Sequence, residues 1–186
     1  MDIEDPTSAL GEPSIDPLAP RVDGLDGLRI GLYDNGKMAA EPVLHVLRGK
    51  LADRYEDVTF ATFALQAKHE IHDHENQVRV REWARSGLDV CIGAIGDCGS
   101  CTKYLTWGIQ ILEEEGVPSV GLVDAGFELD WQTNAVERGM PLRYTTTAVR
   151  SEVRDHEQIA SRLTPGALDD IEAELTRPRT AREMGQ

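Results

Sequence analysis

Two closely spaced cysteines are the residues of this chain best suited to covalent chemistry. Cys98 and Cys101 stand in C-x-x-C spacing between an apolar, β-branched stretch and a segment with helical periodicity. Thiols so spaced at the first turn of a helix can close a small disulfide ring, and the amides and dipole of a helix start favour a thiolate. The spacing therefore predicts redox or nucleophilic chemistry at Cys98, with Cys101 as the second thiol.

Two other interpretations stand beside this one: half of a zinc site, or two thiols packed in the core. Zinc sites usually take four ligands, and the chain contains no second C-x-x-C or C-x-x-H pair, so we expect no metal and no cofactor. The third cysteine, Cys91, lies within the apolar run and is predicted to be a buried small hydrophobe. An odd number of cysteines also fits a reducing cytoplasm better than a disulfide framework.

The residues around the pair are candidates for capping, proton transfer and binding. Asp97 suits the N-cap of the following helix and also a proton acceptor for Cys101, and N-cap preferences favour capping. The hydroxyls of Ser100 and Thr102, with the backbone of Gly99 between the thiols, are placed to hydrogen-bond a thiolate or a substrate. We therefore assign Asp97 with the two cysteines to catalysis and the other three residues to substrate binding.

A second loop, Asn35-Gly36-Lys37, follows the first apolar run and opens a helix. Free amides at a helix start, together with a lysine, can receive a carboxylate or phosphate. The loop lacks the glycine patterns of dinucleotide-binding and nucleoside-triphosphate-binding loops, and a plain turn is the competing interpretation. We predict that Asn35, Gly36 and Lys37 contribute to substrate binding.

Residues 69–75 hold three of the five histidines together with three carboxylates. Such side chains can bind a divalent metal, but their spacing follows no ordered metal motif. We therefore expect a solvated acidic loop here.

The composition excludes several classes of partner. The formal charge is −14, with 33 acidic residues and only four lysines, so nucleic acid and anionic membranes are repelled. This balance suits a salt-adapted cytoplasm, and it equally suits a GC-rich genome that exchanges lysine for arginine. The chain lacks a run long enough to cross a bilayer and the start of a signal peptide, so we expect a cytoplasmic protein.

Apolar runs alternate with helical periodicity along the chain. The pattern predicts strands at residues 28–34, 58–63, 88–95, 118–123 and 142–146, and helices at 38–55, 78–85, 100–115, 128–138, 149–163 and 165–175. Alternation of this kind indicates a three-layer α/β fold, flavodoxin-like or Rossmann-like, with a mostly parallel sheet of about four to five strands.

The predicted core domain spans residues 28–147, between an extended, proline-containing N-terminal arm (1–27) and a helical C-terminal extension (148–186). The arm is expected to lie on the domain or on a second copy of the chain, which leaves a homo-oligomer open. Ligands of such sheets bind beyond the carboxyl ends of the strands. In a flavodoxin-type order the first and third strands are neighbours, so both candidate loops share one rim.

The chain resembles the UGSC family, whose members carry selenocysteine or cysteine in a U/C-Gly-Ser-Cys motif. The resemblance rests on residues 18–21 (LAPR), 28–37 (LRIGLYDNGK), 93–102 (GAIGDCGSCT) and 112–120. It implies a thiol- or selenol-based redox role, with Cys98 at the selenocysteine position and Cys101 as the resolving thiol.

We therefore expect a thiol-dependent redox enzyme, or a subunit of one, acting on a small-molecule substrate. A cytoplasmic thiol reductant or a partner subunit would regenerate the thiols. The alternative is a non-catalytic module that binds a small molecule or another protein and uses its cysteines structurally.

Overall fold

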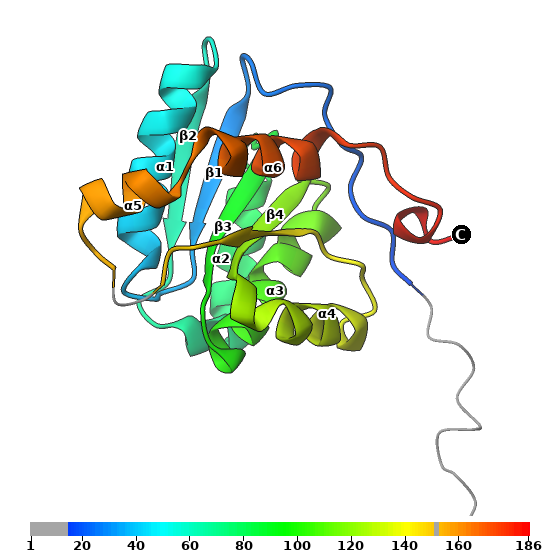
Figure 1. Cartoon of the computed structure of the whole chain (residues 1–186). Helices are drawn as coiled ribbons and strands as arrows, with labels where there is room; N and C mark the ends of the chain where they lie inside the picture. Colours follow the sequence, from blue (N-terminus) through cyan, green and yellow to red (C-terminus); the bar gives the residue numbers. More distant parts are fainter. Residues whose placement is uncertain (1–14, 151–152) are drawn as a thin grey trace, which may run out of the picture.

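The computed structural model describes residues 15–150 and 153–186, so residues 1–14 of the predicted arm lie outside the described residues. Five strands form one sheet, all parallel, in the order β2-β1-β3-β4-β5 (Figure 1). This is the flavodoxin order, and it confirms the predicted fold class. The strands are β1 (Arg29–Asp34), β2 (Thr59–Ala64), β3 (Val90–Gly96), β4 (Ser119–Asp124) and β5 (Tyr144–Thr147).

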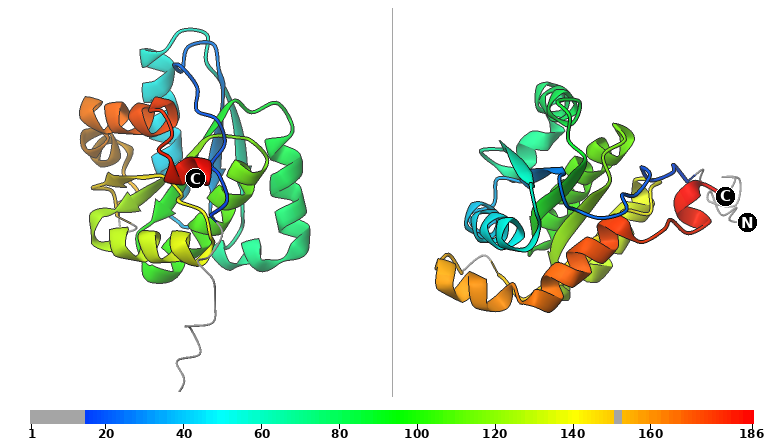
Figure 2. Two further views of the ribbon diagram at one scale, coloured as in Figure 1. Left: turned by 90° about the vertical axis from the view of Figure 1, so that its right-hand side faces the viewer. Right: turned by 90° about the horizontal axis from the view of Figure 1, so that it is seen from above.

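Helices cover both faces of the sheet, as Figure 2 shows from above. One face packs α1 (Ala40–Arg54), α5 (His156–Arg162) and α6 (Pro165–Thr176). The other packs α2 (His74–Ala84), α3 (Gly99–Glu114) and α4 (Glu128–Glu137). Three short 3-10 helices complete the described elements: η1 (Lys68–His72), η2 (Ala125–Phe127) and η3 (Arg182–Met184).

The centre of the sheet is apolar on both sides because successive strand residues point to opposite faces. All residues of β3 are buried; Ile92 packs toward α1 and α6, whereas Cys91 packs toward α2 and α3. Cys91 is a free, fully buried cysteine, as the apolar run predicted. Because β3 is packed on both faces, its position in the sheet is fixed, and so is the point at which the chain passes into the following loop.

Of the helix expected at residues 149–163, residues 151 and 152 lie outside the described residues, and the described helix covers only His156–Arg162. It begins at His156, because Asp155 adopts an extended backbone and its carboxylate accepts a hydrogen bond from Gln158 N. Such a cap defines a helix start. Val149 instead donates its amide N–H to the hydroxyl of Thr147, at the end of β5.

Described residues 15–27 of the arm lie along the domain (Figure 1). Leu18 is buried, and Arg21 pairs with Glu113 at 2.7 Å in a site where both side chains are almost fully buried. Glu113 also accepts the amides of Ala19 and Ser119, so one carboxylate joins the arm, the end of α3 and the start of β4. Burial raises the pKa of Glu113, and Arg21 opposes that rise.

Both described ends of the chain meet on this side: Leu18 N donates to the backbone oxygen of Glu183. Among the described residues, no helix has the combination of length and apolar character needed to cross a membrane.

Replacement of Gly108 by alanine should destabilise the protein, because its Cβ would overlap the ring of Tyr33, which is fully buried between α3 and β1. We expect a loss of about 1 to 3 kcal/mol in the free energy of unfolding, measured by urea denaturation. The matched control is Gly49→Ala in α1, where no atom lies within 4 Å of the new Cβ. That change should stabilise by about 0.5 to 1 kcal/mol through helix propensity. Equal effects at the two glycines would contradict this packing argument.

Candidate functional site

Cys98 and Cys101 form a disulfide where β3 passes into α3, with their Cα atoms 5.1 Å apart. The two sulfurs differ in access, since Cys98 is partly exposed and Cys101 is fully buried. The pair therefore consists of one partly exposed cysteine and one that is shielded from solvent.

The N-cap of α3 is Cys98, and the prediction that Asp97 caps this helix is wrong. Cys98 has an extended backbone, and its Sγ accepts a hydrogen bond from Cys101 N at 3.1 Å. The hydroxyl of Thr102 returns a bond to the carbonyl of Cys98 at 2.8 Å. A cap must reach the N2 or N3 amide, and Asp97 stands one residue too early to do so.

Asp97 has instead a buried side chain beside the sulfurs. Its carboxylate is 1% exposed and its Oδ1 lies 3.2 Å from Nζ of Lys37. Despite this ion pair, neither carboxylate oxygen has a partner in hydrogen-bond geometry among the described residues. One carboxylate oxygen and the two sulfurs all lie within 4.8 Å of one another. Because the sulfurs are joined in a disulfide, they offer a metal no thiolate, and the group is a buried carboxylate next to a disulfide.

Lys68 is the functional candidate that sequence reasoning missed. Its Nζ lies 3.7 Å from Sγ of Cys98, 3.6 Å from Sγ of Cys101 and 2.9 Å from Oγ of Ser100. The sequence did hold one signal for Lys68: the chain has only four lysines, so each is a candidate for a specific role. The ammonium groups of two of them, Lys37 and Lys68, lie at this site. Lys68 lies 30 residues from Cys98 in the sequence, so no local motif contains both residues.

The segment that carries Lys68 is helical, so the expectation of a loop at residues 69–75 is wrong, although most of its polar side chains are exposed to solvent as expected. It forms η1 and the first turn of α2, and Ile71 anchors it in the core while His69 and the next two histidines stay exposed. An apolar residue inside an otherwise polar stretch supplied the burial that fixes this backbone. In the described residues the histidines do not gather with other candidate ligands into a metal-binding group.

Asn35 holds the two loops of the rim together. Its side-chain Nδ2 donates to the backbone oxygen of Ile95 at 3.0 Å, and its Oδ1 accepts from Ile95 N at 3.1 Å. The register of β3 against β4 shifts between Gly93 and Gly96, which leaves Ile95 without a partner in β4. The buried side-chain amide of Asn35 therefore bonds Ile95 where a neighbouring strand would. Because Asn35 is fully buried, a substrate cannot reach it.

Gly36 brings η1 to the same rim. It has a φ of +77°, and a Cβ at this position would meet backbone atoms of Ala67 at 2.7 to 2.8 Å. This close approach places Lys68, the next residue, against the cysteines. Asp34 steadies the turn by accepting the amide of Gly36 at 2.8 Å, and burial raises the pKa of the Asp34 carboxyl to about 6 despite that bond.

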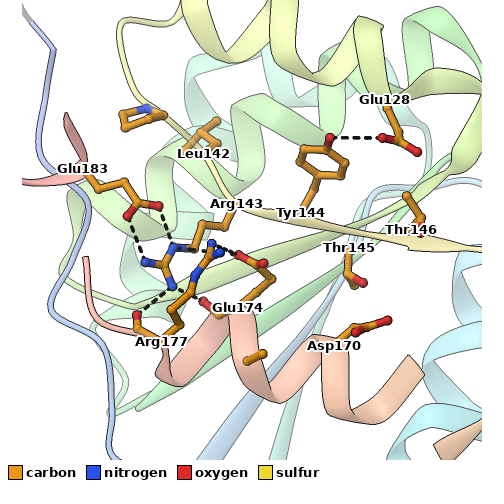
Figure 3. Close-up of a pocket in the computed structure, with 12 residues that line it drawn as sticks. Glu128, Leu142, Arg143, Tyr144, Thr145, Thr146, Asp170, Glu174, Arg177 and Glu183 are labelled. Carbon is orange, nitrogen blue, oxygen red and sulfur yellow. Dashed lines mark hydrogen bonds and ion pairs between the residues drawn. The ribbon is translucent and has the colours of Figure 1, made fainter. Parts of the chain in front are cut away.

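A cavity of about 450 Å³ lies elsewhere, beside edge strand β5 and α6, and none of its lining residues belongs to the two loops (Figure 3). Its buried Arg143 donates to both carboxylate oxygens of Glu183 and to backbone oxygens of residues 174, 177 and 178. Burial would raise the pKa of Glu183, but hydrogen bonds from Arg143 and Thr180 outweigh it and lower that pKa to about 2. Through these five hydrogen bonds Arg143 holds the C-terminal segment in place. Because all five of its N–H donors are used, the cavity offers a ligand no free guanidinium group.

Fold and site together define a flavodoxin-like α/β protein with a C-x-x-C disulfide at the carboxyl rim of its sheet. The sequence model of the UGSC family matches residues 2–177, nearly the whole chain. The chain therefore belongs to the UGSC family. Neither the curated proteins nor the solved structures contain a match to it.

Replacement of Asn35 by alanine should cost about 2 to 4 kcal/mol of unfolding free energy, because it leaves the buried N–H and C=O of Ile95 without partners. The matched control is Asn134→Ala in α4, whose amide makes a single local bond to the backbone of Asp130. That change should stay within about 1 kcal/mol of the wild type. Thermal or urea unfolding measures both, and a tolerant Asn35→Ala variant would show that the rim is held by other contacts.

Proposed function

We propose that this protein is a thiol-based oxidoreductase, or the thiol subunit of one, that reduces a small molecule with the Cys98–Cys101 pair. The observation that carries the proposal is the asymmetry of the pair: an accessible sulfur at a helix start, a buried sulfur behind it, and a lysine in contact with both. A structural disulfide needs neither an exposed sulfur nor an ammonium group beside it.

In the reduced protein Cys98 acts as the nucleophile. Its thiolate is favoured by the amide of Cys101 and by the ammonium group of Lys68, both of which already contact its sulfur in the disulfide form. With a disulfide substrate, the Cys98 sulfur bonds one substrate sulfur and the other leaves as a thiolate.

Cys101 then attacks the Cys98 sulfur of the mixed disulfide, and the second substrate thiolate leaves. The two protein thiols have given two electrons to the substrate and have lost two protons, and a cytoplasmic thiol reductant restores them. Cys101 is buried, so its proton needs a nearby acceptor. Asp97 fits this role because its buried carboxylate lies within 4.8 Å of the sulfurs and, besides its ion pair with Lys37, accepts no hydrogen bond from the described residues.

The two cysteines should show different phenotypes with a neutral probe, 2-hydroxyethyl disulfide. We expect Cys101→Ser to accumulate a mixed disulfide at Cys98, and Cys98→Ser to form none, as read by intact mass and peptide mapping. Cys91→Ala is the matched control, since Cys91 is buried and free, and it should reduce the probe like the wild type. A disulfide that resists reduction by small thiols, or adducts that form first on Cys101, would favour the non-catalytic alternative.

Asp97→Asn should separate the two chemical steps. Loss of a general base slows the step that needs it by about a hundredfold, so resolution of the mixed disulfide should slow by this order while the first attack by Cys98 changes much less. Single-turnover mass spectrometry resolves the two rates. The deficit should shrink as the pH rises, because hydroxide then removes the proton of Cys101. Equal slowing of both steps would assign Asp97 a purely structural role.

A further inference from the structure

The site distinguishes substrates by charge as well as by electrophilicity. Building on the thiol chemistry proposed above, we propose that Lys68 is its recognition residue and that the substrate is a small monoanion, with a carboxylate or similar oxyanion close to the electrophilic atom.

The two lysines of the rim are not equivalent. Lys37, which the sequence suggested as the anion-binding residue, lies 3.2 Å from the carboxylate of Asp97 and is neutralised by it. Lys68 forms no ion pair among the described residues; its Nζ contacts only a serine hydroxyl and the two sulfurs. Of the two lysines at this rim, Lys68 is thus the one whose charge no carboxylate of the described residues balances.

The surroundings of Lys68 favour an anion of small size. No acidic residue stands in the first turn of α3, so the positive end of the helix also faces the cysteine turn. On the other flank of the turn, Oδ1 of Asp130 lies 3.3 Å from where a Cβ of Gly99 would be. One free cation beside one carboxylate suits a single negative charge and disfavours a dianion or an extended polyanion. The chain as a whole carries −14, so the local positive charge is what brings an anion to this point.

The charge of Lys68 becomes more available as the reaction proceeds. In the reduced protein the ammonium group stabilises the thiolate of Cys98. Once Cys98 has bonded to the substrate its sulfur is neutral, and the ammonium group is then free to bind the substrate's own carboxylate. This binding therefore strengthens after the attack has begun, which is the kind of interaction that lowers a barrier.

The test compares two alkylating agents of nearly equal shape, iodoacetate and iodoacetamide, on the reduced full-length protein. In both cases the sulfur of Cys98 bonds to the methylene carbon and iodide leaves, but only iodoacetate carries a carboxylate. Loss of Lys68 lowers the thiolate population for both reagents alike, so the ratio of the two second-order rate constants isolates recognition of the anion. Peptide mass spectrometry locates the label, and circular dichroism confirms the fold of each variant.

We expect Lys68→Met to lower the iodoacetate-to-iodoacetamide ratio by about 1.5-fold to fivefold, the range of a partly exposed ion pair. Lys103→Met is the matched control, because Lys103 is an exposed lysine of the same helix, and its ratio should equal that of the wild type. An unchanged ratio in Lys68→Met, or an equal fall in Lys103→Met, would overturn the proposal. Failure of both reagents to label Cys98 in the wild type would instead reject the thiol function on which it rests.

Discussion

The rim of the sheet that carries the Cys98–Cys101 disulfide depends on one buried side-chain amide. Asn35 stands at the end of β1 and satisfies both the N–H and the C=O of Ile95 in β3, where the sheet's own register is interrupted. A buried backbone group without a hydrogen-bond partner lowers the free energy of unfolding. The backbone of β3 therefore keeps this path toward the cysteines only while the amide of Asn35 is in place. This constraint sets the position of the C-x-x-C turn. It therefore also sets the distance of the turn from the loops that carry Lys37 and Lys68.

The helix that follows is held at both of its ends. At its start, the sulfur of Cys98 and the hydroxyl of Thr102 close the first turn. Near its end, Glu113 binds Arg21, Ala19 and Ser119 in a buried cluster that also fastens the arm. Between them, Gly108 lets α3 rest directly on Tyr33 of β1. A helix fixed in this way keeps its cysteines at a constant distance from the sheet, which is what a reaction between two neighbouring sulfurs requires.

The positive charge at this rim comes from two lysines, Lys37 and Lys68, which have different partners. The pair formed by Lys37 and Asp97 places a carboxylate, which would otherwise be costly to bury, next to the sulfurs. Lys68 stays free of carboxylates and contacts the sulfurs themselves. On a strongly acidic protein this arrangement places two lysine ammonium groups next to the disulfide, where the proposed reaction would take place.

The sequence by itself determined the order of strands and helices, the burial of Cys91 and the adjacency of the two rim loops, because these follow from hydrophobic period and from parallel-sheet topology. It also determined the C-x-x-C pair, whose spacing is local. The cap of α3 and the start of α5 depend on local backbone conformation that the hydrophobic period does not report. Tertiary structure alone decided that Lys68 reaches the sulfurs. Capping depends on the extended backbone of Cys98, and the position of Lys68 depends on the contact between Gly36 and Ala67. Interactions between residues about thirty positions apart leave no periodic trace in the chain, so only the packed structure brings them to light.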